Sequence, residues 1–188
     1  MIREDIIKQH VANKNILDIG SVGQTDSYSL WTLYRQFNVK SVIGIDIEEI
    51  TNENKKLFNI SLPDFSSQIV TGDMETYSFD KEFDVIVAGD VIEHVKNQGL
   101  FLLNIRKHLK KGGELIITTP NAKWPTVFLK PNPTHSLWHD RYTLKRILES
   151  SGFKIDYFKY YFGNKNRYNF FRKLLIIRQS LLVIASKH

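Results

Sequence analysis

The chain has 188 residues, of which 42% are hydrophobic and 24% are charged, so it is long enough for one domain with a buried core and short for two. It contains no cysteine, which excludes disulfides, thiolate metal sites and catalysis by a cysteine nucleophile. The formal net charge of +6 leaves room for an anionic partner, although its meaning depends on where the excess charge lies.

Short apolar runs alternate with helical patterns along the chain. The runs that predict strands are residues 15–19, 41–47, 68–71, 83–88, 114–119, 153–162 and 181–186. The segments that predict helices are residues 2–11, 26–37, 91–110, 140–150 and 167–178. This alternation is typical of βαβ units, and we expect an α/β fold, a doubly wound three-layer sandwich around a seven-stranded, mostly parallel sheet.

Residues 120–140 interrupt this alternation. They hold four of the five prolines, together with Trp124, Trp138, His135 and His139. Connections of this length without regular structure are uncommon, and they often act as lids over binding sites. Because the segment follows a predicted strand, at the edge where open α/β sheets bind ligands, we expect it to cap a substrate pocket.

The first predicted strand runs into a turn that contains glycines. Gly20 and Gly23 follow the strand, and glycine lets the backbone approach a ligand where a Cβ atom would clash. Asp18 lies within the end of this strand, where its carboxylate would repel the pyrophosphate of a dinucleotide. A cationic ligand meets no such repulsion, so the acid favours S-adenosylmethionine over NAD.

Two further acids lie at the ends of the next two predicted strands. Asp46 ends the second strand, where a carboxylate can accept hydrogen bonds from both hydroxyls of a ribose. In the alternative interpretation Asp46 caps a following helix that carries Glu48 and Glu49 in its first turn. Asp73 follows the third strand, and it either accepts a hydrogen bond from the exocyclic amine of adenine or simply belongs to a turn.

Five motifs follow one another at regular intervals: residues 16–23 (ILDIGSVG), 42–46 (VIGID), 72–75 (GDME), 83–95 (FDVIVAGDVIEHV) and 109–121 (LKKGGELIITTPN). In this order they resemble the class I S-adenosylmethionine-dependent methyltransferases, and most closely their small-molecule groups known as type 11 and type 12. The resemblance covers residues 14–160. It implies a Rossmann-like methyltransferase fold whose last strand is antiparallel to its neighbours.

The resemblance also implies which residues bind the cofactor. Those near the methionine portion, and the methyl group that it carries, would be Asp18, Gly20, Gly23, Gly89 and Asp90. Those near the nucleoside would be Asp46 at the ribose and Asp73 with Met74 at the adenine, and Ser21 and Ile47 complete the predicted set. The family usually reads Asp-x-Gly-x-Gly-x-Gly in its first loop, whereas Val22 and Gln24 replace two of those glycines here, so this loop must follow a different local path.

Methyl transfer from a sulfonium needs a well-positioned acceptor, and it needs a base only when the acceptor is a neutral hydroxyl or a similar acid. The candidate catalytic residues are Asp90, His94, His135 and His139. His94 has an alternative role in bracing the start of a helix. The i, i+4 spacing of His135 and His139 also suits a metal, but the surrounding prolines argue against a helix there, so we expect no metal site.

The excess positive charge lies in residues 154–188, which hold eight lysines and arginines against one acid, Asp156. The same segment is rich in aromatic residues. A solvated basic helix and a buried strand account for both features, so we favour a small-molecule acceptor. RNA or an anionic membrane surface is the alternative partner.

Three alternatives to a small-molecule methyltransferase stay open from the sequence. They are a nucleic-acid methyltransferase that uses the basic C-terminal segment, an NAD-linked oxidoreductase, and a cofactor-binding protein without catalytic activity. The NAD alternative lacks the Gly-x-Gly-x-x-Gly pattern of dinucleotide sites. No apolar run reaches the length of a membrane span, and the first residues do not resemble a secretory signal, so we expect one cytoplasmic domain over residues 1–188.

Overall fold

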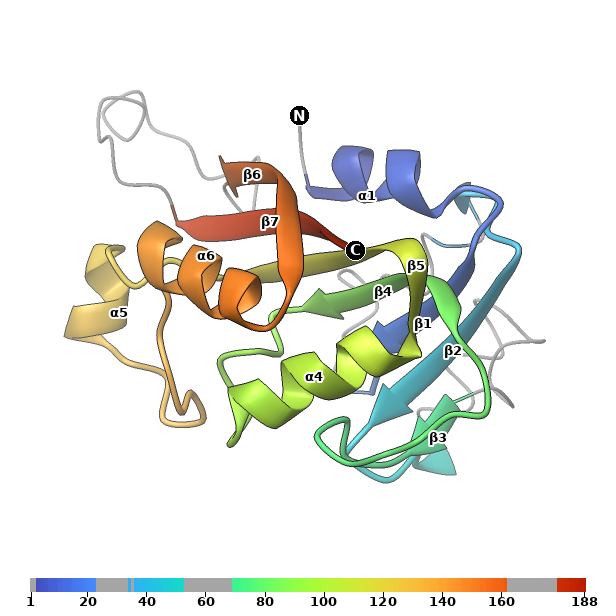
Figure 1. Ribbon diagram of the computed structural model, residues 1–188. Coiled ribbons are helices and arrows are strands. Elements are labelled where there is room, and N and C mark those ends of the chain that lie inside the picture. The colour runs from blue at the N-terminus through green and yellow to red at the C-terminus, as the bar shows by residue number, and fades with distance from the viewer. Residues whose placement is uncertain (1–2, 23–33, 35, 53–68, 162–178) are drawn as a thin grey trace.

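The computed structural model describes residues 3–22, 34, 36–52, 69–161 and 179–188. Seven strands form one sheet in the order β3-β2-β1-β4-β5-β7-β6 (Figure 1). The strands are β1 (Asn15–Ile19), β2 (Ser41–Asp46), β3 (Ile69–Thr71), β4 (Phe83–Gly89), β5 (Leu109–Pro120), β6 (Phe153–Tyr161) and β7 (Ser180–Lys187). All seven predicted strands are therefore present, with bounds close to those expected except at the start of β5.

Strands β3, β2, β1, β4 and β5 pair in parallel, whereas β7 pairs antiparallel with both β5 and β6. The predicted mixed sheet with an antiparallel last strand is confirmed. The chain first builds outward from β1 to β3 and then returns to place β4 on the other side of β1. In sheets of this kind ligands bind at such a switch point, outside the carboxyl ends of the strands.

Helices cover both faces of the sheet (Figure 1). Helix α1 (Arg3–Val11) packs on one face, and α4 (Gln98–His108) and α6 (Arg141–Ser150) pack on the other. Each face has its own apolar cluster, centred on Ile16 and Val85 on the α1 side and on Leu17 and Ile86 on the α4 side. Neighbouring residues of one strand thus point into opposite cores, which confirms the three-layer sandwich.

The connection between β4 and α4 differs from the expected helix over residues 91–110. Residues 91–97 form turns, and α4 begins only at Gln98. Asn97 caps the helix, since its side chain accepts a hydrogen bond from the Leu100 N–H. The apolar residues among 91–95 are spaced as in a helix, and Ile92 is indeed buried in the core. However, Asp90 has a φ of 55°, and this left-handed backbone turns the chain before the helix starts.

Strand β5 begins earlier than expected, at Leu109 rather than at Glu114. Gly112 and Gly113 follow the predicted helix over residues 91–110 and are residues that would stop it. They lie inside this long strand, at an irregularity where its register against β4 shifts. Gly112 has a φ of 71°, and a Cβ atom on Gly113 would lie 2.9 Å from the Lys110 carbonyl oxygen. Both glycines therefore serve a bulge in the strand rather than a loop.

The proposed lid, residues 120–140, contains a short helix, α5 (Pro125–Leu129). Its two ends are tied together, because Asn121 and His139 form an isolated β-bridge and the Ala122 N–H donates to the His139 carbonyl at 2.7 Å. Of the predicted helix over residues 26–37 the described part includes the helical residues Tyr34 and Gln36. The predicted helix over residues 167–178 lies outside the described residues.

Candidate active site

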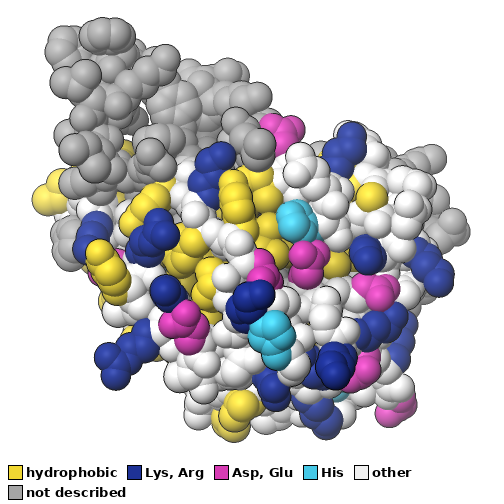
Figure 2. Space-filling model, turned by 45° about the horizontal axis from the view of Figure 1, so that its top comes forward, with side chains coloured by type: hydrophobic (Ala, Val, Ile, Leu, Met, Phe, Trp, Pro, Cys, Tyr) yellow, Lys and Arg dark blue, Asp and Glu magenta, His cyan; other side chains and the backbone are white. Residues whose placement is uncertain are grey.

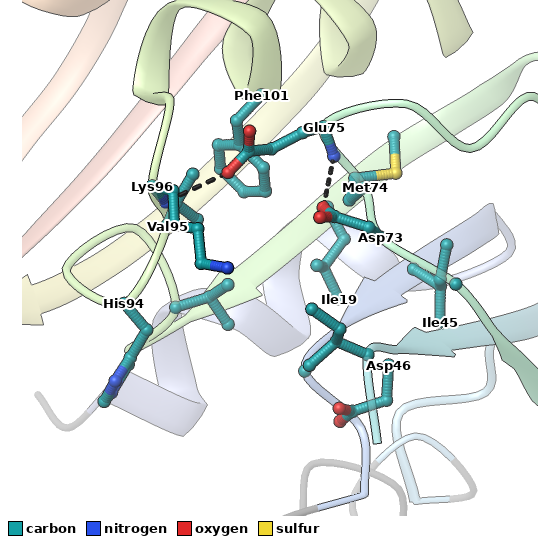
Figure 3. A pocket seen from close by; sticks show the side chains of 14 residues that line it. Ile19, Ile45, Asp46, Asp73, Met74, Glu75, His94, Val95, Lys96 and Phe101 are labelled. Atoms are coloured by element: carbon teal, nitrogen blue, oxygen red, sulfur yellow. Dashed lines mark hydrogen bonds between the residues drawn. The ribbon is translucent and has the colours of Figure 1, made fainter. Parts of the chain in front are cut away.

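A pocket opens at the carboxyl ends of the first three strands (Figure 3). It encloses about 570 Å³ of free space, part of it open to solvent. The residues that line it come from the strand ends, from the turn after β4 and from α4: Ile19, Gly20, Ile45, Asp46, Ile47, Gly72, Asp73, Met74, Glu75, Val91, His94, Val95, Lys96 and Phe101. This is the switch point of the sheet, and the pocket brings together five of the predicted cofactor-binding residues: Gly20, Asp46, Ile47, Asp73 and Met74. Their contact with a cofactor stays a prediction.

The turn after β1 passes close to the turn after β4. Gly20 has a φ of 79°, and a Cβ atom at this position would lie 2.6 Å from the Val91 Cγ2 atom. Its N–H donates to the Ile45 carbonyl at 2.9 Å, which joins the ends of β1 and β2. Glycine is thus required both for the backbone conformation and for the close approach. Gly23 lies outside the described residues, so its predicted role stays a prediction.

Asp46 organises the backbone around the pocket. One carboxylate oxygen accepts from the Val22 N–H at 2.7 Å and the other from the Glu48 N–H at 3.0 Å. Residues 47–50 are not helical, so Asp46 does not act as the helix cap considered from the sequence. Asp46 is 8% exposed as a residue and lies in the pocket wall, where the remaining lone pairs of its carboxylate are available to a ligand.

Asp73 and Glu75 hold the opposite side of the pocket. The Asp73 carboxylate accepts from the Glu75 N–H at 2.8 Å, and the Glu75 carboxylate accepts from the backbone N–H groups of Lys96 and Asn97, both at 2.9 Å (Figure 3). Glu75 is a site residue that the sequence analysis missed. The only local signal for Glu75 was its position two residues after Asp73. Its hydrogen-bond partners, Lys96 and Asn97, are more than 20 residues away along the chain, so the sequence did not reveal this contact.

Asp18 lies under the first loop rather than in the lining of the pocket. It is fully buried, and its carboxylate accepts hydrogen bonds from the Tyr34 hydroxyl at 2.8 Å and from the Ser21 hydroxyl at 3.1 Å. Burial, together with the charge of Asp18, raises the pKa of Tyr34 well above its ordinary value. Asp18 and Ser21 therefore support the loop from below, and their predicted contact with the cofactor stays a prediction.

Gly89 ends β4, and Asp90 follows it at the edge of the sheet. The Asp90 N–H donates to the Thr118 carbonyl at 2.9 Å, and the carboxylate lies 3.3 Å from the Arg3 guanidinium. Burial and the charge of Asp90 raise the pKa of Tyr161 to about 12. Arg3 and Tyr161 were not predicted, because they come from α1 and from β6, far apart in the sequence, and no local pattern marks them.

Glu93 is 1% exposed, although it carries a carboxyl group. One of its oxygens accepts from the Thr119 hydroxyl at 3.0 Å. Burial, and then the charge of nearby Asp90, raise the pKa of Glu93 to about 8. A carboxyl group in such surroundings resists ionisation unless a positive charge stands beside it.

Two histidines from distant parts of the chain meet beside Glu93. The rings of His94 and His135 are perpendicular, with their centroids 4.7 Å apart. The Nδ1 atom of His94 lies 3.1 Å from the Thr134 carbonyl oxygen, and this contact fixes Nδ1 as the protonated nitrogen. Of the predicted catalytic residues, Asp90, His94 and His135 thus lie near the carboxyl end of β4.

His139 is placed differently. It is buried, and its Nε2 atom lies 2.9 Å from the Gln98 side-chain amide, whose nitrogen also donates to the Ile92 carbonyl. Burial lowers the pKa of His139. These contacts anchor the end of the proposed lid to the start of α4, and His139 is not among the residues that line the pocket.

The sequence matches a family model described as "Methyltransferase domain" over residues 3–157, which is most of the chain. The chain belongs to this methyltransferase family. The predicted methyltransferase family is thereby confirmed, and the NAD-linked oxidoreductase is set aside. S-adenosylmethionine as the methyl donor belongs to the proposal below.

Relatives of this methyltransferase differ in what their names say they act on. The ubiquinone biosynthesis O-methyltransferase of Rickettsia akari is 32% identical over 60% of this chain and 43% of its own length. The tRNA U34 carboxymethyltransferase of Nautilia profundicola is 28% identical over 63% of this chain and 39% of its own length. The chain thus matches less than half of each of these relatives.

A solved structure shows the same fold. The magnesium protoporphyrin IX methyltransferase of Synechocystis PCC 6803, determined with bound S-adenosylhomocysteine, superposes with a TM-score of 0.68 at 18% identity, covering 97% of this chain and 78% of that one. Among the described residues of the methyltransferase, none of the helices has the length and apolar character needed to cross a membrane.

Proposed function

We propose that this methyltransferase transfers the methyl group of S-adenosylmethionine to an oxygen, nitrogen or carbon nucleophile of a small molecule. The observation that carries the proposal is the pocket at the switch point, in which the Asp46 and Asp73 carboxylates lie around one cavity with largely apolar walls. The cytoplasmic location expected from the sequence forms part of the same proposal.

The pocket suits the nucleoside of this donor. Ile45, Met74 and Phe101 offer apolar surface to an adenine ring, and Asp46 and Asp73 offer carboxylate oxygens to the hydroxyls of a ribose and to an exocyclic amine. The predicted residues Gly20, Gly89 and Asp90 would then lie along the methionine portion. When bound, the donor supplies a methyl group on a positively charged sulfur.

The chain's own residues would place the acceptor and exclude water. Most of the rate of an in-line displacement can come from holding the nucleophile close to the methyl group and in line with the sulfur. Asp90, His94 and His135 lie near the end of β4. For a neutral hydroxyl acceptor, Asp90, or a histidine that keeps an unshared lone pair, would receive the proton. Residues 120–140 would cover this end of the pocket, because their last residues are anchored to α4 through His139.

A nucleic-acid acceptor is the second candidate, since one relative is named as a tRNA-modifying enzyme. An RNA-binding face needs a continuous basic surface. On the face shown in Figure 2, lysines and arginines of the described residues are mixed with acidic side chains and with an apolar area, and they form no single basic stripe. The described part of this face therefore offers no basic stripe to RNA, whereas five of the eight bases of residues 154–188 lie outside the described residues.

An assay of S-adenosylhomocysteine formation tests the proposal. The protein is given S-adenosylmethionine with a panel of small phenols and amines, and separately with total tRNA. We expect turnover with at least one small molecule and none with tRNA above the rate without acceptor. Turnover confined to tRNA, with an affinity that falls steeply as salt rises, would favour the nucleic-acid candidate. Binding of the donor with no turnover in either set would support a cofactor-binding protein without catalytic activity.

A further inference from the structure

We propose that Glu93, His94 and His135 form a binding site for one divalent transition-metal ion of the Zn²⁺ type. One donor atom from each residue can be chosen so that all three lie within 4.8 Å of one another. Two of the residues lie next to each other after β4, and the third comes from the segment between α5 and α6. The site adjoins the pocket, since His94 also lines the pocket wall.

Glu93 provides the strongest argument. Its side chain is 1% exposed, and its Oε1 atom has no hydrogen-bond partner among the described residues, whereas Oε2 accepts from the Thr119 hydroxyl. An unpaired carboxylate oxygen taken out of water is costly, and natural proteins compensate it with a donor or a cation. An ion beside Oε1 would supply that compensation.

The two histidines are also prepared for a metal. Since the Nδ1–H of His94 donates to the Thr134 carbonyl at 3.1 Å, its Nε2 atom keeps an unshared lone pair. Metal-binding histidines typically fix their other nitrogen in this way. The Nδ1 atom of His135 is buried and without a partner in the described part of the chain. Coordination through this atom places the ring proton on Nε2, so the Asn132 amide, whose nitrogen lies 3.1 Å from Nε2, must turn.

The donor set indicates which ions fit. Two imidazoles and one carboxylate suit Zn²⁺ and neighbouring transition metals, whereas Mg²⁺ and Ca²⁺ prefer oxygen ligands alone. Ligands bound at about 2.0–2.2 Å to one ion lie at most about 4.4 Å apart, so a small inward movement of the present donors closes the site. Three protein ligands leave at least one position open to water or to an oxygen of a substrate.

From the sequence, a metal was considered only at His135 and His139, and His94 was not considered together with His135. His135 and His139 have a helical spacing in a segment rich in proline, and the structure does not bring them together as ligands. It places His135 against His94 instead, and His139 against Gln98. The pairing of His94 with His135 depends on the path of residues 120–140, which no local pattern encodes.

Titration of the full chain, first treated with a chelator, tests the site without reference to activity. Calorimetry with Zn²⁺ and the visible absorption of Co²⁺ report binding and donor type. We expect one ion per chain, and at least about tenfold weaker binding in Glu93→Gln and in His135→Ala. His10→Ala removes the imidazole of another histidine–carboxylate pair, 3.0 Å from Glu114, and serves as the matched control with unchanged affinity.

Folding of each variant is checked by its thermal unfolding, and His135→Ala keeps the test valid if Glu93→Gln does not fold. Absence of metal binding by the unaltered protein, or equal affinity in both variants and the control, would overturn the site. S-adenosylhomocysteine binding is measured on the same metal-free samples. A protein that binds this product but no metal would refute the metal site alone, and one that binds metal but not the product would refute only the proposed function.

Discussion

Asp18 is fully buried, and its carboxylate accepts two hydrogen bonds, one from the Tyr34 hydroxyl and one from the Ser21 hydroxyl. Ser21 belongs to the loop that Asp46 also holds through the Val22 N–H. Two acids that the sequence marks as direct ligands thus act first as supports of the loop. The loop of this protein has fewer glycines than its family pattern, and these side-chain contacts supply order that the backbone alone does not.

Replacing Tyr34 by phenylalanine tests this support. The substitution removes a hydrogen bond to a buried carboxylate, and we expect the free energy of unfolding to fall by about 1–3 kcal/mol. Chemical denaturation measures the change. Tyr142→Phe, at a tyrosine that is 73% exposed, is the control and should have little effect. Equal stability of Tyr34→Phe and the unaltered protein would show that the hydroxyl does not support Asp18.

Whether the sequence could locate a site residue depended on whether its contacts follow from the order of the strands or from the packing of distant elements. Asp46 and Asp73 could be located from the sequence because each lies at the end of a strand, and the ends of parallel strands meet at one edge of the sheet. Arg3 and Tyr161 could not be located, because their contact with the site depends on the packing of α1 and β6. Glu93 could be seen as an acid, but its burial could not.

Among the elements, α6 shows how local sequence fixes a boundary. Asp140 precedes the helix, and its carboxylate accepts from the N–H groups of Tyr142 and Thr143 at 2.9 and 2.8 Å. The Thr143 hydroxyl accepts from the Asp140 N–H at 2.9 Å, which completes a capping box. Lys123, from the proposed lid, lies 3.2 Å from the same carboxylate. The predicted helix over residues 140–150 is therefore confirmed with its cap.

This cap predicts a pH dependence of stability. The backbone hydrogen bond from Thr143 lowers the pKa of Asp140, and Lys123 adds to the effect. A group whose pKa is lowered by folding stabilises the fold above its unfolded pKa of about 3.9, and this contribution is lost as the pH falls through the lower folded value. Asp140→Asn keeps an acceptor but no charge, so we expect it to be less stable than the unaltered protein by about 0.3–1 kcal/mol near neutral pH.

The difference should shrink toward zero in acid, because both proteins then carry an uncharged side chain at position 140. Urea denaturation at several pH values measures it. Asp80→Asn, at an exposed position between β3 and β4, is the control for a general loss of charge. A difference that stays constant from neutral to acidic pH would show that the charge of Asp140 is not the cause.

The elements that the sequence placed wrongly share a physical reason. Residues 91–97 have an apolar spacing compatible with a helix, but the left-handed backbone at Asp90 and the Asn97 cap delay the helix. Gly112 and Gly113 look like a stop, but they lie in a bulge of β5. In both places the local signal has two valid interpretations, and the structure follows the one that the sequence analysis did not choose.

At the scale of the whole molecule, the alternation of strands and helices predicted the sandwich and its mostly parallel sheet, whereas the antiparallel last strand followed from the family resemblance. The order of the strands places the carboxyl ends of β1, β2 and β3 around one pocket, and Asp46 and Asp73, at the ends of β2 and β3, line it. What could not be predicted is the region after β4, where the turn and residues 120–140 bring Glu93, His94 and His135 together. Binding sites are commonly built by such irregular segments, which vary more than the sheet.

The central claim is that the pocket binds the nucleoside of S-adenosylmethionine through the carboxylate of Asp46. Calorimetric titration with S-adenosylhomocysteine tests it most directly. We expect binding of one molecule per chain, with an affinity at least about tenfold lower in Asp46→Ala and also reduced in Asp46→Asn, and unchanged in the Asp80→Ala control. Thermal unfolding confirms that each variant is folded. Equal affinity in the folded Asp46 variants and the unaltered protein would contradict the account.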